Sequence, residues 1–117
     1  MTNSKTVRLR VMQGDTIAFG PGKASLLLAI ESTGSISGAA REMEMSYRRA
    51  WLLVEEMNRC FSKPLVETAT GGAKGGGAHL TELAREVISC YQHMQKKADA
   101  AVEKDMQHLR SLIVAQD

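Results

Sequence analysis

The sequence predicts one small domain that is mostly α-helical with a small β component. Three observations carry this prediction. Two helix-forming segments follow each other closely within residues 35–61, a strand-like run at 65–70 leads into a glycine-rich tip, and apolar residues recur at helical spacing from 80 to 113. A chain of 117 residues, 44% of them hydrophobic, can bury one core and is too apolar for a disordered chain.

Composition excludes several classes of protein. The longest unbroken apolar run, residues 26–30, is too short to span a bilayer, so we expect no membrane partner. The charged N-terminus lacks the apolar stretch of a signal peptide, and Cys60 and Cys90 are too few for a disulfide framework. We therefore expect a reduced, cytoplasmic protein. The net charge of +2 indicates little, and 4% aromatic residues argue against a single-strand or RNA binder.

The N-terminal part is expected to form a hairpin followed by a helix. Apolar residues alternate with arginines over 7–11, Gly14-Asp15 is a turn pair, and 16–19 would be the return strand. Pro21 suits the first position of a helix, because its missing N–H would have no partner there. This helix is expected to end at Thr33-Gly34.

Ser35 and Ser46 are predicted N-caps of the next two helices, since a hydroxyl there can accept a hydrogen bond from a free backbone N–H. The first helix should span about ten residues and the turn after it about three, which matches helix-turn-helix geometry. The glycine-tipped hairpin that follows would be the wing. Trp51 is interpreted as core packing, although its indole N–H could reach a phosphate. The apolar stripe of the second helix is Tyr47, Ala50, Trp51, Val54, Met57 and Phe61.

No helix-breaking residue lies between Leu80 and about Ile113, so one long helix is predicted. Its apolar stripe makes nine steps over 33 residues, about 3.7 residues per step, the period of a nearly straight helix roughly 50 Å long. A second copy about a two-fold axis is the simplest cover for this stripe. The alternative is a solvated helix that frays beyond Ala100. The predicted dimer interface is Tyr91, Met94, Ala98, Val102, Met106, Leu109 and Ile113.

Arg48 and Arg49 stand in the first turn of the helix that Ser46 would cap. Backbone donors and the helix dipole already present positive charge there, and each cation costs about 0.3–1 kcal/mol. A phosphate or a guanine edge would turn this cost into a gain. The alternative is that both arginines pair with Glu42, Glu44 or solvent. We expect DNA contact.

The glycine-rich tip at 71–77 admits two functional interpretations and one without function. As a nucleotide-phosphate loop it fails, because it lies between strands and no Gly-Lys-Ser/Thr motif follows. As a wing, its glycines let backbone amides approach phosphate closely while Lys74 neutralises charge. The remaining alternative is a merely flexible hairpin. We expect a wing tip formed by Lys74, Gly75, Gly76 and Gly77.

Other motifs carry no predicted chemistry. Residues 20–25 superficially resemble a phosphate loop but lack its first glycine and its hydroxyl residue, so they are interpreted as a strand-to-helix turn. The three histidines have no companion ligands at metal spacing. We expect no metal site, no cofactor, no catalytic residues and no enzymatic activity.

Several short motifs resemble the DNA-binding domain of the ModE family of molybdate-responsive transcriptional regulators and, more distantly, the LysR-type winged helix-turn-helix. They are residues 34–40 (GSISGAA), 45–51 (MSYRRAW), 56–58 (EMN), 64–66 (PLV), 70–72 (TGG) and 74–81 (KGGGAHLT). The resemblance covers roughly residues 20–90. It implies a homodimer on a two-fold operator, with Ser46, Tyr47, Arg48 and Arg49 opening the recognition helix and Ser35 and Ser37 beside the DNA backbone. No molybdate site is expected in this chain, which ends at Asp117.

Together these observations predict a winged helix-turn-helix with a long C-terminal dimerisation helix, divided into residues 1–80 and 81–117. The predicted function is sequence-specific binding of double-stranded DNA by a homodimeric transcriptional regulator. The alternative is a protein-interaction module of the same fold without DNA affinity, which the modest net charge permits. The predicted DNA contacts are Ser35, Ser37, Ser46, Tyr47, Arg48, Arg49, Lys74, Gly75, Gly76 and Gly77.

Overall fold

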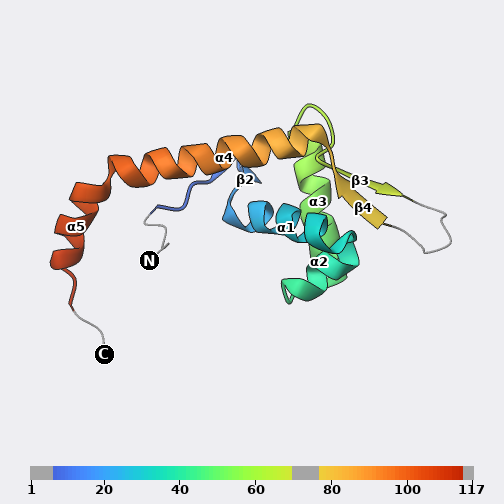
Figure 1. Ribbon diagram of the computed structural model, residues 1–117, viewed down its shortest axis with the longest axis horizontal. Helices are drawn as coiled ribbons and strands as arrows, with labels where there is room; N and C mark the ends of the chain where they lie inside the picture. Colours follow the sequence, from blue (N-terminus) through green and yellow to red (C-terminus); the bar gives the residue numbers. More distant parts are fainter. Residues whose placement is uncertain (1–6, 70–76, 115–117) are drawn as a thin grey trace.

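The computed structural model describes residues 7–69 and 77–114, and this part of the chain is mostly helical with two small antiparallel sheets (Figure 1). The mostly helical class predicted from the sequence is therefore confirmed. The elements in order are β1 (Val11–Gln13), β2 (Thr16–Phe19), α1 (Pro21–Thr33), α2 (Ile36–Glu42), α3 (Tyr47–Cys60), β3 (Val66–Ala69), β4 (Gly77–Leu80), α4 (Glu82–Ala101) and α5 (Glu103–Ser111).

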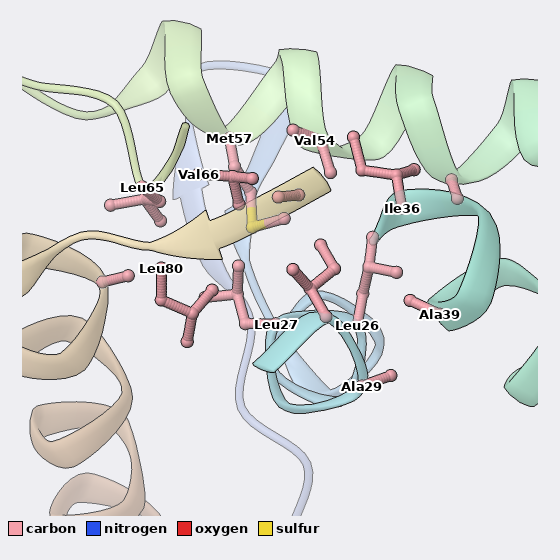
Figure 2. Packing of buried hydrophobic residues seen from close by; sticks show 14 of the residues in the cluster. Leu26, Leu27, Ala29, Ile36, Ala39, Val54, Met57, Leu65, Val66 and Leu80 are labelled. Carbon is pink, nitrogen blue, oxygen red and sulfur yellow. The ribbon is translucent and has the colours of Figure 1, made fainter. Parts of the chain in front are cut away.

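Helices α1, α2 and α3 enclose the hydrophobic core together with β2, the β3–β4 hairpin and the first half of α4 (Figure 2). Its largest fully buried side chains are Phe19, Leu26, Leu27, Ile30, Met57 and Leu65. α1 ends at Gly34, whose φ of 79° is a left-handed conformation that glycine adopts without strain, and whose N–H donates to the Ile30 carbonyl at 2.8 Å. The predicted end of this helix is confirmed.

Both predicted serine caps are present and set the starts of α2 and α3. The Ser35 hydroxyl accepts from the Gly38 N–H at 2.8 Å, and the Ser46 hydroxyl accepts from the Arg49 N–H at 3.0 Å. α2 has seven residues rather than about ten. It stops earlier because Glu44 takes a left-handed conformation with φ of 58°, which ends the helix and turns the chain toward α3.

The β3–β4 hairpin pairs Val66 with Leu80 and Ala69 with Gly77, as a wing requires. It is fastened to the end of α1, because the Ala78 N–H donates to the Gly34 carbonyl at 2.9 Å. Residues 70–76 lie outside the described residues, and with them the predicted wing-tip residues Lys74, Gly75 and Gly76.

The first hairpin is shorter than predicted, since β1 begins at Val11 and not near Val7. Residues 7–10 instead run beside α4 (Figure 1), whose side chains bind their main chain. The Tyr91 hydroxyl donates to the Leu9 carbonyl at 2.7 Å, and the Val7 N–H donates to Asp99 Oδ1 at 3.1 Å. Gln95 donates to the Val7 carbonyl as well. These side-chain bonds take the place of strand pairing.

The prediction of one unbroken C-terminal helix is wrong. The helix is interrupted at Val102, and α5 turns sharply away from α4 (Figure 1). Val102 is β-branched and therefore a weaker helix former than its neighbours. The segment after it also carries the charge order of an independent helix, with Glu103 and Asp105 in its first turn and His108 and Arg110 in its last. No residue of α5 is buried in the described chain, so packing does not hold the two helices in line.

Candidate nucleic-acid interface

The first turn of α3 presents two free arginine side chains. Arg48 and Arg49 are exposed, and within residues 7–69 and 77–114 neither guanidinium pairs with a carboxylate. The pairing with Glu42 or Glu44 considered as an alternative is therefore not found there. Both cations lie at the positive end of a 14-residue helix, with no ion-pair partner among the described residues. The position favours an external anion.

A hollow of about 360 Å³ opens beside this turn, and we call it the hydroxyl hollow. It lies between the start of α2, one side of α3 and the β3–β4 hairpin. Four of the predicted DNA contacts, from three different elements, meet in its wall: Ser35, Ser37, Tyr47 and Gly77. Among the described residues its lining is Ser35, Ile36, Ser37, Tyr47, Trp51, Thr68, Ala69, Gly77 and Ala78.

The hydroxyl hollow is rich in hydrogen-bond donors, and none of the described residues that line it carries a charge. Three aliphatic hydroxyls, the Tyr47 phenol and the Trp51 indole N–H line it. The Ser35 and Ser37 hydroxyl oxygens lie 3.5 Å apart. A Cβ added to Gly38 would lie 2.9 Å from the Ser35 hydroxyl, so glycine lets that hydroxyl sit against α2. Such a wall can donate to a phosphate oxygen without neutralising its charge.

The interpretation of Trp51 as core packing is wrong. Its side chain is 42% exposed and that of Tyr47 is 55% exposed, whereas Ala50, Val54 and Met57 are buried. The buried face of α3 is narrower than the predicted apolar stripe, because its buried residues are Ala50, Val54 and Met57. The exposure of Trp51 leaves its indole N–H accessible, which agrees with the alternative that it reaches a phosphate.

Arg49 does not line the hydroxyl hollow but a larger cleft on the other side of α3. Successive residues of an α-helix are rotated by about 100°, so Tyr47 and Arg49 lie about 200° apart around the axis. Arg48 stands between them on the solvent face, next to Leu52 one turn further on. The predicted contacts Arg48 and Arg49 thus point to different surroundings.

The residues predicted to form a dimer interface have different surroundings too. Tyr91 is buried in its own chain, with its ring edge-on to Phe19 at a centroid distance of 5.1 Å. Met94, Leu109 and Ile113 are exposed, and Ala98, Val102 and Met106 are partly buried. Tyr91 is therefore already covered, while the others leave apolar surface on both α4 and α5.

Among the residues that the structure describes, no three His, Cys, Asp or Glu side chains gather as a metal site would require. None of the helices in that part is long and apolar enough to cross a bilayer.

Fold and site together define a small, mostly helical protein whose candidate interface is the start of α3, flanked by a donor-lined hollow and a hairpin. No family model matches the chain. Its homologues include regulators called ModE and molybdenum-pterin-binding proteins called Mop.

The chain is 41% identical over 98 residues to the transcriptional regulator ModE of Yersinia pestis, an alignment covering 81% of this chain and 37% of that protein. It is equally 41% identical over 99 residues to the DNA-binding transcriptional dual regulator ModE of Escherichia coli K12, covering 81% and 38%. It is 43% identical over 81 residues to the molybdenum-pterin-binding protein MopB of Rhodobacter capsulatus, covering 69% of this chain and 30% of that protein. The aligned part thus spans 30–38% of the length of these relatives.

Proposed function

We propose that this chain is a winged helix-turn-helix protein of the ModE family that binds double-stranded DNA as a homodimer and regulates transcription. Residues 1–80 would form the DNA-binding unit and 81–117 the dimerisation unit. One observation carries the proposal: Ser35, Ser37, Tyr47 and Gly77 converge on one hollow beside two unpaired arginines. The name of the Escherichia coli relative, a DNA-binding regulator, supports DNA as the partner.

In this proposal α3 is the recognition helix and Arg48 reads a base. Arg48 stands at the middle of the exposed face and close to the N-terminus of α3, where recognition helices contact base edges. Arginine binds guanine through two parallel hydrogen bonds to O6 and N7. Ser46 fixes the first turn through its cap, so the arginine is carried by a defined backbone.

The hydroxyl hollow would receive the sugar–phosphate backbone that runs between the recognition helix and the wing. A concave wall fits a convex strand, and its hydroxyl and indole groups can donate to phosphate oxygens. In this proposal Ser35, Ser37, Tyr47, Trp51 and Thr68 face that strand. Because the described residues of the wall are uncharged, these contacts would position the duplex and release few counterions.

The β3–β4 hairpin would be the wing. Its base is held by the Ala78–Gly34 hydrogen bond, and across its strands His79 Nε2 lies 3.3 Å from Glu67 Oε1. Gly77 stands where the wing meets the hydroxyl hollow. Lys74, Gly75 and Gly76 are proposed to contact phosphate from the tip.

A second copy would cover the apolar surface of α4 and α5. The break at Val102 changes the expected interface, since Met94 and Leu109 no longer lie on one straight stripe. A partner must follow both helices around the bend. Sedimentation equilibrium tests this part: we expect a dimer, and Leu109→Glu should shift it toward monomer.

The central experiment is selection of bound fragments from random duplex DNA, followed by titration of the enriched site at low and moderate KCl. We expect enrichment of a two-fold sequence and binding that survives added salt better than that of random duplex. A protein-interaction module without DNA affinity would enrich nothing. The proposal assigns DNA binding and no molybdate binding to this chain.

A further inference from the structure

A cleft larger than the hydroxyl hollow lies on the opposite side of α3, and we call it the arginine cleft. Its volume is about 660 Å³, and its walls come from the first hairpin, the start of α1 and α3. Three arginines line it: Arg8, Arg10 and Arg49. Arg8 and Arg10 precede the helices and belong to none of the contacts assigned so far.

The charges of the arginine cleft are unbalanced. Its buried lysine, Lys23, is satisfied by Glu56, whose Oε1 lies 2.6 Å from Nζ, so this pair contributes no free cation. Asp15 is the other carboxylate in the lining. Among described residues, none of the three guanidinium groups has an ion-pair partner. The cleft therefore holds an excess of free positive charge.

Arg49 connects the arginine cleft with the proposed recognition surface. It belongs to the first turn of α3, whose solvent face carries Arg48, while Tyr47 and Trp51 face the hydroxyl hollow. The exposed face of α3 is thus flanked by an uncharged hollow on one side and a cationic cleft on the other. A helix in the major groove lies between two phosphate strands, one along each flank.

We propose that the arginine cleft binds phosphates of the duplex strand on the far side of the major groove, with Arg8 and Arg10 as further DNA contacts. This inference rests on the proposed function. The two flanks of α3 would then differ chemically. Neutral donors of the hydroxyl hollow would position one DNA strand, and guanidinium groups of the arginine cleft would bind the other. Arg49 contacts phosphate on the cleft side, while Arg48 reads the base.

The test compares the salt dependence of binding to the selected duplex between wild type and Arg8→Gln/Arg10→Gln. Each lost phosphate contact lowers the slope of log K against log[KCl] by about 0.9, so the slope should fall by about 1–2 per protomer. The control is Lys96→Gln/Lys97→Gln, which removes the same charge from the exposed part of α4 and should leave the slope unchanged. Asp15→Asn removes a carboxylate from the cleft and should tighten binding several-fold.

The outcomes separate the two proposals. If the wild type binds no duplex, the proposed function fails. If it binds a selected site and the arginine variant keeps the full slope, DNA binding stands and the arginine cleft is not part of it. Calorimetry with inorganic pyrophosphate adds a third result: binding that the arginine variant abolishes, with the DNA slope unchanged, would assign the cleft to a free anion and overturn the inference. Melting curves establish that each variant is folded.

Discussion

Lys23 and Glu56 form a partly buried ion pair between α1 and α3, with Nζ 2.6 Å from Oε1 and only 5% of Lys23 exposed. The same ammonium donates to the Ile17 carbonyl of β2, so one cation joins three elements. This explains the run at residues 20–25 that superficially resembles a phosphate loop. Its lysine faces the protein and binds no nucleotide, as the interpretation as a strand-to-helix turn requires.

A double-mutant cycle at this pair should show strong coupling. Glu56→Ala leaves a buried ammonium with one carbonyl partner and should lower the free energy of unfolding by about 1–3 kcal/mol, because the unpaired charge stays desolvated. Lys23→Met/Glu56→Ala removes that charge and should be more stable than Glu56→Ala alone. Urea denaturation measures both; equal stability of the two variants would contradict the assigned burial cost.

Replacement of Arg48 by alanine should weaken binding to the selected duplex by about 1–3 kcal/mol and relax specificity at one base position. Arg49→Ala should weaken binding to all sequences alike, because its partner is a phosphate. Arg59→Ala, an exposed arginine near the end of the same helix, is the control. Unchanged affinity in both first-turn variants would refute the recognition role of α3.

Lys74→Ala should reduce the salt dependence of binding and leave sequence preference unaltered. A lysine on a wing tip contacts phosphate, and losing one such contact lowers the slope of log K against log[KCl] by about 0.9. Selection repeated with the variant checks the preference. A changed consensus would mean that Lys74 reads bases.

Trp51 gives an intrinsic signal for the hydroxyl hollow, because it is the single tryptophan of the chain and is 42% exposed. DNA binding should shift or quench its fluorescence as water leaves the indole. Trp51→Phe keeps an aromatic ring but loses the N–H, and should weaken binding several-fold with no change in salt dependence. Fluorescence that stays constant through a saturating titration would show that the strand passes elsewhere.

Tyr91 should make stability depend on alkaline pH. Burial raises the pKa of its phenol above the usual 10.0, while the Arg10 guanidinium acts in the opposite direction. The folded state therefore holds the proton more tightly than the unfolded state. Its contribution is complete below pH 10 and is lost as pH rises through the folded pKa.

Urea denaturation between neutral pH and pH 11 follows this loss. Tyr91→Phe should remove the alkaline decline due to this group and cost about 0.5–1.5 kcal/mol at neutral pH, because the bond to Leu9 is lost. Tyr47→Phe, at an exposed phenol, should retain the decline. If Tyr91→Phe retains it equally, another group is responsible.

Local signals predicted the helix starts well. Ser35, Ser46 and Gly34 act through their own neighbourhood, so a short stretch of sequence determines each of them. The arrangement of Tyr47 and Trp51 depends on how wide the core is, which periodicity alone does not reveal. The β3–β4 hairpin completes the hydroxyl hollow from a distant part of the chain.

Two predictions, the start of the first hairpin and the exposure of Tyr91, differ from the structure because they depend on contacts between distant parts of the chain. Three side chains of α4, Tyr91, Gln95 and Asp99, bind main-chain atoms of Val7 and Leu9, and a hydrophobic pattern does not reveal these partners. The sequence pattern therefore places Tyr91 on a dimer surface, whereas its ring packs against Phe19 in the structure. The break at Val102 is predictable from the sequence, because the acidic residues Glu103 and Asp105 are typical of the first turn of a new helix.

The hydrogen bonds between α4 side chains and the main chain of residues 7–9 have an evolutionary consequence. Tyr91, Gln95 and Asp99 hold this segment through the peptide groups of Val7 and Leu9, and these hydrogen bonds do not involve the intervening side chain. Residue 8 can mutate while the segment keeps its course. Descendants of this chain can thus acquire or discard a cation beside α3, and retune their attraction to a target, without rebuilding the scaffold that presents it.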